Sequence, residues 1–181
     1  MRKIVLTGGP YSGKSTLAEA LSGLGFAVVP EAAIQVIESL GRELGSEAAR
    51  DWRSANHVEF QLRIVRLQLS LEEQAEQSGA ALAVCDRGVP DGLAYMRHWQ
   101  VEPPAELVEA ARRARYERVF LLDTLAGARP RTETGRVDEH ESERVRDLLA
   151  AVYREHDHEP VAVPERSLEE RIQLIRRHLD I

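Results

Sequence analysis

Residues 8–15 read Gly-Gly-Pro-Tyr-Ser-Gly-Lys-Ser and fit the pattern G-x-x-x-x-G-K-[ST] without a mismatch. An apolar run at residues 3–7 precedes them, and a helical pattern from about residue 14 to 23 follows. Gly8 and Gly13 allow backbone conformations in which successive N–H groups converge on phosphate oxygens, and the positive end of a following helix adds to the attraction. The stretch therefore predicts a strand, a phosphate-binding loop and a helix, which together begin a P-loop α/β fold.

The loop suggests a role for each of its polar residues. We expect Lys14 to place its charge at the β- and γ-phosphates of a nucleoside triphosphate, and the Ser15 hydroxyl to ligate Mg²⁺. ATP is the expected nucleotide because the sequence has no Asn-Lys-x-Asp motif to specify guanine, although GTP stays open. A chance glycine turn is the alternative, and the correct strand and helix flanks argue against it. The other residues expected to bind the nucleotide are Gly8, Gly9, Pro10, Tyr11, Ser12, Gly13 and Thr16.

Length and composition limit the class of protein. A chain of 181 residues with 43% hydrophobic and 30% charged residues is expected to form one folded domain, residues 1–181. The net charge of -6 gives no general attraction to nucleic acid or to anionic membranes. No apolar stretch approaches the ~20 residues that cross a bilayer. Cys85 is the only cysteine, so no internal disulfide can form. We therefore expect a cytoplasmic protein without nucleic-acid partners or membrane insertion.

Short apolar runs alternate with helical patterns along the chain, which predicts βαβ units: a three-layer sandwich with a five-stranded, mainly parallel sheet and helices on both faces. The expected strands are 3–7, 26–29, 81–85, 118–122 and 160–163. The expected helices are 14–23, 31–42, one or two within 47–77, 89–98, 104–115, 139–156, and a last one that begins at Ser167 with a capping box completed by Glu170. The stripes expected to face the core are Val58, Leu62, Val65 and Leu69; Val145, Leu148, Leu149 and Val152; and Leu168, Ile172, Ile175 and Leu179.

Charged residues follow two of the expected strands, at the edge where such sheets bind ligands. Asp86 and Arg87 close the strand 81–85; the carboxylate can hold Mg²⁺ through water and the arginine can bind a phosphate. A helix-capping Asp and a surface Arg are the alternative. Glu31 closes the strand 26–29, where a carboxylate can accept a proton from a substrate hydroxyl. A carboxylate in the first turn of a helix is an equally open interpretation.

The stretch 124–138 contains Gly, Pro and three arginines without any apolar period, so we expect a mobile, lid-like loop. Arg131 is the favoured candidate to close over the γ-phosphate, ahead of Arg129 and Arg136; solvated loop arginines are the alternative. Asp91 and Tyr95 lie one helical turn apart, where they either line an acceptor pocket or, for Tyr95, pack in the core.

Three segments together resemble the small AAA-28-type P-loop ATPases. They are the phosphate loop, Val-Val-Pro-Glu-Ala-Ala at 28–33, and Asp-Arg-Gly-Val-Pro-Asp-Gly-Leu-Ala-Tyr at 86–95, and a late Val-Tyr-Arg and Val-Ala-Val-Pro extend the likeness. This group is similar to nucleoside and nucleoside-monophosphate kinases and to the nicotinamide-riboside-kinase domain. The resemblance implies the sheet order 2-3-1-4-5, with the strand 81–85 beside the phosphate-loop strand and Asp86 next to the Mg²⁺ site.

The resemblance also implies roles for two site residues. Glu31-Ala-Ala resembles the Glu-Pro-x of deoxynucleoside kinases, in which that Glu acts as base. Asp86-Arg87-Gly88 resembles the Asp/Glu-Arg-Ser of the same enzymes and the Asp-Arg-x of thymidylate kinases.

Two functions remain open from the sequence. The first is a kinase that transfers the γ-phosphoryl group of ATP to a small nucleoside- or nucleotide-like acceptor. The second is a regulatory switch that binds and hydrolyses ATP or GTP without such an acceptor. A kinase needs an acceptor cavity with converging polar groups among residues 31–57 and 87–95, and the site chemistry favours this function. The catalytic residues expected for it are Lys14, Glu31, Asp86, Arg87 and Arg131.

Overall fold

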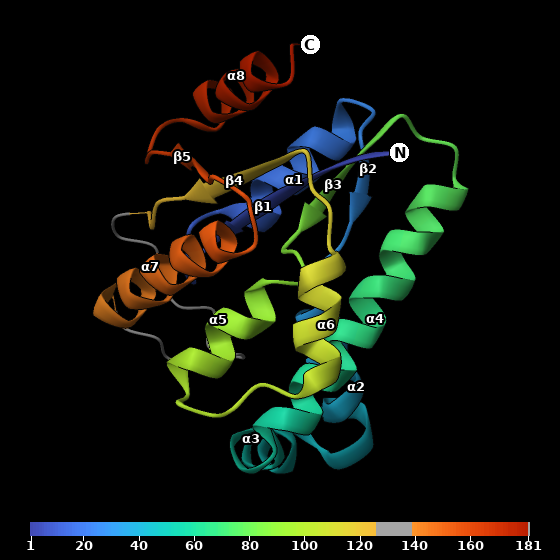
Figure 1. The fold of residues 1–181 in the computed structure, drawn as a ribbon, viewed down its shortest axis with the longest axis vertical. Helices are drawn as coiled ribbons and strands as arrows, with labels where there is room; N and C mark the ends of the chain where they lie inside the picture. The colour runs from blue at the N-terminus through green and yellow to red at the C-terminus, as the bar shows by residue number, and fades with distance from the viewer. Residues whose placement is uncertain (126–138, 181) are drawn as a thin grey trace.

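The computed structural model describes residues 1–125 and 139–180, and this part of the chain holds five strands and eight helices (Figure 1). All four strand pairs are parallel, and the order β2-β3-β1-β4-β5 confirms the expected sheet. The register pairs Leu6 with Asp86 and Gly8 with Leu122, so the central strand β1 reaches the phosphate loop beside Asp86. The strands are β1 Arg2–Gly8, β2 Ala27–Val29, β3 Leu82–Asp86, β4 Arg118–Leu122 and β5 Val161–Val163.

The helices follow the expected segments, and residues 47–77 form two of them rather than one. The break lies at Asn56. Its side-chain amide donates a hydrogen bond of 2.8 Å to the backbone carbonyl of Trp52 and so satisfies a carbonyl in the last turn of the first helix. The helices are α1 Lys14–Gly23, α2 Ala32–Leu44, α3 Ser46–Ala55, α4 His57–Gln77, α5 Asp91–His98, α6 Ala105–Arg113, α7 Glu139–Glu155 and α8 Leu168–His178.

Alternate side chains of β1 divide the core between the two faces of the sheet. Ile4 and Leu6 pack with α1 and α8, whereas Val5 packs on the other face with α4, α5, α6 and α7. Figure 1 shows α8 above the sheet and α5, α6 and α7 below it. A smaller cluster joins α2, α3 and α4 beyond the edge of the sheet. Its buried members are Val36, Leu40, Ala49 and Phe60.

The expected apolar stripe of α4 is half wrong, because the buried face of this helix is largely polar. Val65 is buried, but Val58 and Leu69 are 38% and 43% exposed. Gln68 and Glu72 are buried instead, since both make internal hydrogen bonds: the Gln68 amide donates to Glu72 at 2.9 Å and to the Arg87 carbonyl at 3.2 Å. Hydropathy alone therefore placed Leu62 and Val65 at the core correctly but missed the buried polar residues of α4.

In α8, too, one expected apolar position is exposed and a polar residue is buried instead. Its capping box between Ser167 and Glu170 is confirmed. Ile172, Ile175 and Leu179 are buried as expected, and the stripe of α7 is likewise in or against the core. Leu168, however, is 41% exposed, and Arg171 is buried in its place.

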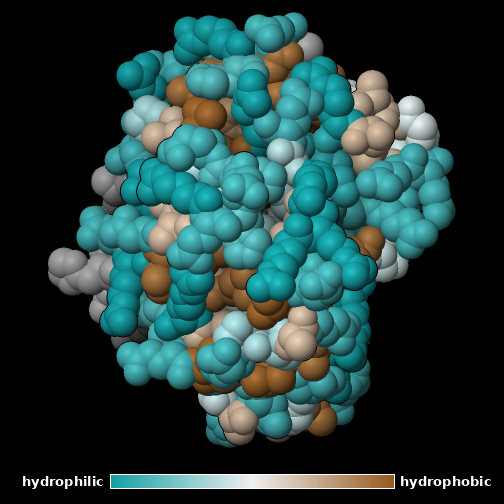
Figure 2. Space-filling view, viewed as in Figure 1, coloured by the Kyte–Doolittle hydropathy of each residue, from teal (hydrophilic) through white to brown (hydrophobic). Residues whose placement is uncertain are grey.

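The surface seen in Figure 2 is mostly hydrophilic, with apolar residues showing in small patches between charged ones. Among the described residues, no helix combines the length and the apolar composition that crossing a bilayer requires.

Candidate active site

The phosphate loop connects β1 to α1, and two of its glycines are required by their surroundings. Gly13 caps α1 with φ 77°, in the left-handed region that favours glycine. A Cβ on Gly9 would lie 2.4 Å from the backbone oxygen of Ser142 in α7, so no side chain fits there. The first turn of α1 carries no acidic residue. Its positive end is therefore open to an anion.

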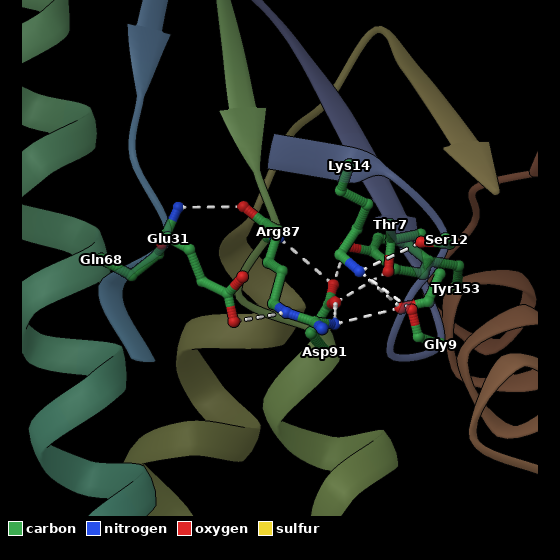
Figure 3. Close-up of polar contacts among 11 residues, drawn as sticks. Thr7, Gly9, Ser12, Lys14, Glu31, Gln68, Arg87, Asp91 and Tyr153 are labelled. Atoms are coloured by element: carbon green, nitrogen blue, oxygen red, sulfur yellow. Dashed lines mark hydrogen bonds and ion pairs between the residues drawn. The ribbon is translucent and has the colours of Figure 1, made fainter. Parts of the chain in front are cut away.

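Lys14 lies folded into this loop and is 6% exposed. Its Nζ donates to the carbonyl oxygens of Gly8 and Gly9 at 3.1 and 3.0 Å and to Oγ of Ser12 at 3.2 Å (Figure 3). Burial, with the nearby charge of Arg87, lowers the pKa of Lys14 to about 8. All three acceptors are neutral, and the carboxylates of Glu31, Asp86 and Asp91 act on the cation only through their charge.

The end of β3 offers oxygen donors beside the loop. Asp86 is 4% exposed and accepts a hydrogen bond from the Ser15 side chain, while its Oδ1 has no hydrogen-bond partner among the described residues. Burial, followed by the charge of Glu31, raises the pKa of Asp86 against the opposing charges of Lys14 and Arg87. Oxygen donors of this kind, one of them buried without a partner, fit the preferences of Mg²⁺.

Arg87 joins the phosphate loop to Glu31. Its Nε donates to Glu31 at 2.9 Å, its Nη1 donates to Gly8 O at 3.3 Å, and its guanidinium lies over the Tyr95 ring with Cζ 5.3 Å from the centroid. Burial alone would lower the pKa of Arg87, but Glu31 and the other acidic neighbours hold it well above the usual value. Burial would likewise raise the pKa of Glu31, but Arg87 and Lys14 hold it below the ordinary value. Glu31 is therefore a carboxylate at neutral pH.

A family model described as an AAA domain, AAA-28, matches residues 3–171 of this chain. The chain belongs to this family. No curated protein matches it in sequence. The 169 matched residues contain the phosphate loop, both charged strand ends and the first four residues of α8.

Solved structures with the same fold are P-loop kinases of nucleosides and nucleotides. The deoxyadenosine kinase of M. mycoides with bound dATP is 16% identical over 100% of both chains, with a TM-score of 0.69. The same enzyme with product dCMP and a flexible dCDP is 18% identical over 98% of both chains, with a TM-score of 0.67. The thymidylate kinase of Ehrlichia chaffeensis is 16% identical over 98% of both chains, with a TM-score of 0.61. At these identities the likeness establishes the fold of this AAA-28 chain.

Asp91 is the first residue whose role sequence reasoning missed, since the sequence offered it only as a residue of the acceptor pocket. It is 3% exposed and accepts hydrogen bonds from Thr7 Oγ1 at 2.7 Å, Tyr153 OH at 2.5 Å, Arg87 Nη1 at 3.1 Å and the Gly88 N–H at 3.2 Å. The available signal was its place at the end of the Asp-Arg-Gly-Val-Pro-Asp stretch, shortly after Arg87 and at the first residue of α5. Tyr153 entered the sequence analysis only as part of the late Val-Tyr-Arg of the family resemblance, which gave it no role.

Arg171 of α8 is the second missed residue. It is 3% exposed and donates to three backbone carbonyls: Ser12 O in the phosphate loop at 2.7 Å, Pro164 O at 3.0 Å and Asp123 O at 3.3 Å. The last helix of the chain therefore holds the phosphate loop directly.

The remaining predictions concern the arginines of the loop 124–138 and the acceptor cavity. Arg129, Arg131 and Arg136 lie outside the described residues. Among the hollows of the described part, one of about 940 Å³ lies between α5, α6 and the turn after α7, and one of about 300 Å³ lies between α2 and α4. Glu31 and Arg87 line neither hollow. The acceptor cavity expected among residues 31–57 and 87–95 therefore stays a prediction at Glu31 and Arg87.

Proposed function

We propose that this chain is a magnesium-dependent kinase that transfers the γ-phosphoryl group of ATP to a hydroxyl group of a small, nucleoside-like acceptor. The observation that carries the proposal is the ion pair of Glu31 with Arg87, placed between the phosphate loop and the carboxyl end of β2. A base needs a proton to accept, and the proposed proton is that of the acceptor hydroxyl. The kinase fold of the solved neighbours is consistent with this chemistry.

In the proposed reaction, the acceptor oxygen attacks the γ-phosphorus while the bond from that phosphorus to the β–γ bridging oxygen breaks. ADP leaves with the bonding electron pair, and Glu31 takes the proton of the acceptor hydroxyl. Lys14 and Arg87 bind and orient the transferring group and stabilise its charge. Lys14 would turn from the loop carbonyls toward the phosphates, exchanging neutral acceptors for anionic ones.

Ser15 and Asp86 would hold Mg²⁺, which when bound shields the charge of the β- and γ-phosphates. Asp86 Oδ1 is the oxygen free to ligate the ion, because it has no hydrogen-bond partner among the described residues. Arg131 stays a proposed participant from outside the described residues.

The charges around Glu31 favour a neutral acceptor over a phosphorylated one. In the described part of the chain, the cations that act on the Glu31 carboxylate are Arg87 and Lys14. Arg87 is bound to Glu31 and Asp91, and Lys14 belongs to the phosphate loop. An acceptor phosphate would need an additional cation. A nucleoside or a similar alcohol needs none.

A transfer assay with ATP and a panel of nucleosides and nucleotides tests the proposal, and Glu31→Gln is the decisive variant. We expect it to retain Mg-ATP affinity in calorimetry and to lose turnover by ~10²-fold or more, the scale of general-base loss. Glu38→Gln, an exposed glutamate on the same helix, is the matched control and should transfer at the wild-type rate. Running the panel with GTP as well checks the choice of ATP.

The regulatory switch predicts a different result. If the wild-type protein transfers phosphate to no acceptor, and Glu31→Gln hydrolyses ATP as fast as wild type does, then Glu31 is only a helix-cap carboxylate. That result would leave nucleotide binding and remove the kinase.

A further inference from the structure

Both oxygens of the Asp91 carboxylate are saturated by donors from three separate elements. Oδ1 accepts from Thr7 Oγ1 at the end of β1 and from Arg87 Nη1, and Oδ2 accepts from Tyr153 OH in α7 and from the Gly88 N–H. Figure 3 shows this group between Arg87 and the phosphate loop. A carboxylate fixed by four donors is in a position to fix one of those donors in turn.

Arg87 is the donor that needs fixing. Its backbone has φ 74°, a conformation that L-residues hold only when the surroundings over-determine it. Its two carboxylate contacts are Glu31, the proposed base, and Asp91. Because a proposed acceptor must approach Glu31, the contact to Asp91 is the carboxylate contact that can hold Arg87 during that approach, beside its hydrogen bond to Gly8 O.

The same group connects α7 to the site at a second point. Tyr153, near the C-terminal end of α7, is fully buried and donates to Asp91, while Ser142, near the start of the helix, donates to Pro10 O in the phosphate loop at 2.7 Å. Thr7 immediately precedes the same loop. One helix and one strand end thus bind both the phosphate loop and the anchor of Arg87.

We propose that Asp91 is a positioning residue, held by Thr7 and Tyr153, that fixes the Arg87 guanidinium between the phosphate loop and Glu31. Through Tyr153, α7 sets the distance between the phosphate side and the acceptor side of the site. The proposal rests on the proposed function for its effect on turnover, whereas its effect on Arg87 itself requires no substrate.

The test uses two variants that each remove one donor to Asp91 with little change in volume, Tyr153→Phe and Thr7→Val. A third variant, Asp91→Asn, changes the acceptor itself. Val152→Ala, a buried change beside Tyr153 that keeps the hydroxyl, is the control for lost packing in α7. The first measurement is hydrogen exchange at Arg87 Nε–H by NMR of the nucleotide-free protein. We expect exchange about tenfold faster in Tyr153→Phe and Thr7→Val, the scale of one lost hydrogen bond, and little change in Val152→Ala.

The second measurement is turnover with Mg-ATP and an accepted acceptor. We expect kcat to fall about tenfold in Tyr153→Phe while the KM for Mg-ATP changes less than about threefold, because misplacement of Arg87 affects the reacting geometry. Arg87 exchange equal to wild type in Tyr153→Phe and Thr7→Val overturns the inference, even if Asp91→Asn fails to fold. Faster Arg87 exchange in a protein without transfer activity upholds the inference and rejects the proposed kinase, so the two failures are distinguishable.

Discussion

Lys14 is a buried cation whose protonation should be visible in the stability of the free protein. Its pKa is about 8 in the fold, against an ordinary value of 10.5. Below pH 8 the lysine is charged in both the folded and the unfolded state, and the folded state carries the full cost of burying it. Between pH 8 and 10.5 the unfolded chain binds more protons, so this group makes the free energy of unfolding rise with pH.

The measurement is urea unfolding of metal- and nucleotide-free protein at pH 7 to 10.5, compared with Lys14→Met. Over this pH range the free energy of unfolding of the wild type should rise by about 3 kcal/mol more than that of the variant, at ~1.4 kcal/mol for each pH unit between the two pKa values. Lys3, the only other lysine, is the control: although burial opposes it, its hydrogen bond to Glu72 raises its pKa. The comparison with Lys3→Met should therefore stay flat from pH 8 to 10. A flat Lys14 comparison would show that Lys14 is not buried as a cation.

Gly9 depends on the close approach of α7. An added Cβ would meet the backbone oxygen and Oγ of Ser142 at 2.4 and 2.5 Å, and a backbone atom cannot move without the helix. Gly9→Ala should therefore lose roughly 1–3 kcal/mol of stability, the range for overpacking.

Gly41 in α2 is the matched control, because an added Cβ there meets nothing within 4 Å. Gly41→Ala should gain roughly 0.5–1 kcal/mol, since alanine is the better helix former. Both values come from chemical denaturation. A Gly9→Ala protein as stable as wild type would mean that α7 does not press on the phosphate loop.

At the scale of elements, the sequence was informative wherever a local rule decided the outcome. The capping box of α8 depends on two residues three apart, and the phosphate loop on a short pattern. The buried face of α4 depends on partners that lie far away in the chain: the carbonyl of Arg87 for Gln68, and Lys3 and Tyr116 for Glu72. No period in hydropathy contains that information, because burial of a polar group follows from its hydrogen bonds.

Helix α8 should contribute to nucleotide binding through Arg171. Arg171→Met removes the donor to Ser12 O, Pro164 O and Asp123 O, and buried carbonyls left unpaired should cost roughly 2–4 kcal/mol of stability. We also expect weaker Mg-ATP binding, because the loop loses one of its supports.

Arg176→Met, an exposed change on the same helix, should stay within about 0.5 kcal/mol of wild type. Denaturation and calorimetry on the two variants give both comparisons. Equal Mg-ATP affinity in Arg171→Met would show that α8 supports the fold but not the nucleotide site.

At the scale of the molecule, parallel strands in the order β2-β3-β1-β4-β5 bring Glu31, the phosphate loop and Asp86 together at the carboxyl ends of the strands. The order of secondary structure predicted that convergence, since carboxyl ends of parallel strands share an edge. It did not predict that Arg87 closes on Glu31, because that depends on a left-handed backbone at Arg87 and on Asp91. Those contacts are set by tertiary packing rather than by the local pattern.

The phosphate loop is attached to both halves of the molecule, since Ser142 of α7 and Arg171 of α8 bind it from opposite faces of the sheet. A ligand on the loop should therefore stabilise the whole chain. At 100 times its Kd, Mg-ATP should add about 2.7 kcal/mol and raise Tm by roughly 5–10 °C in one transition. The measurement is calorimetric melting with Mg-ATP.

The Lys14→Met variant with Mg-ATP is the control, and it should not give this shift, since it lacks the cation that meets the phosphates. Two transitions, of which only one moves with Mg-ATP, would contradict the single cooperative unit of residues 1–181. An unshifted single transition would instead contradict nucleotide binding, because a ligand that binds only the folded state must raise its Tm.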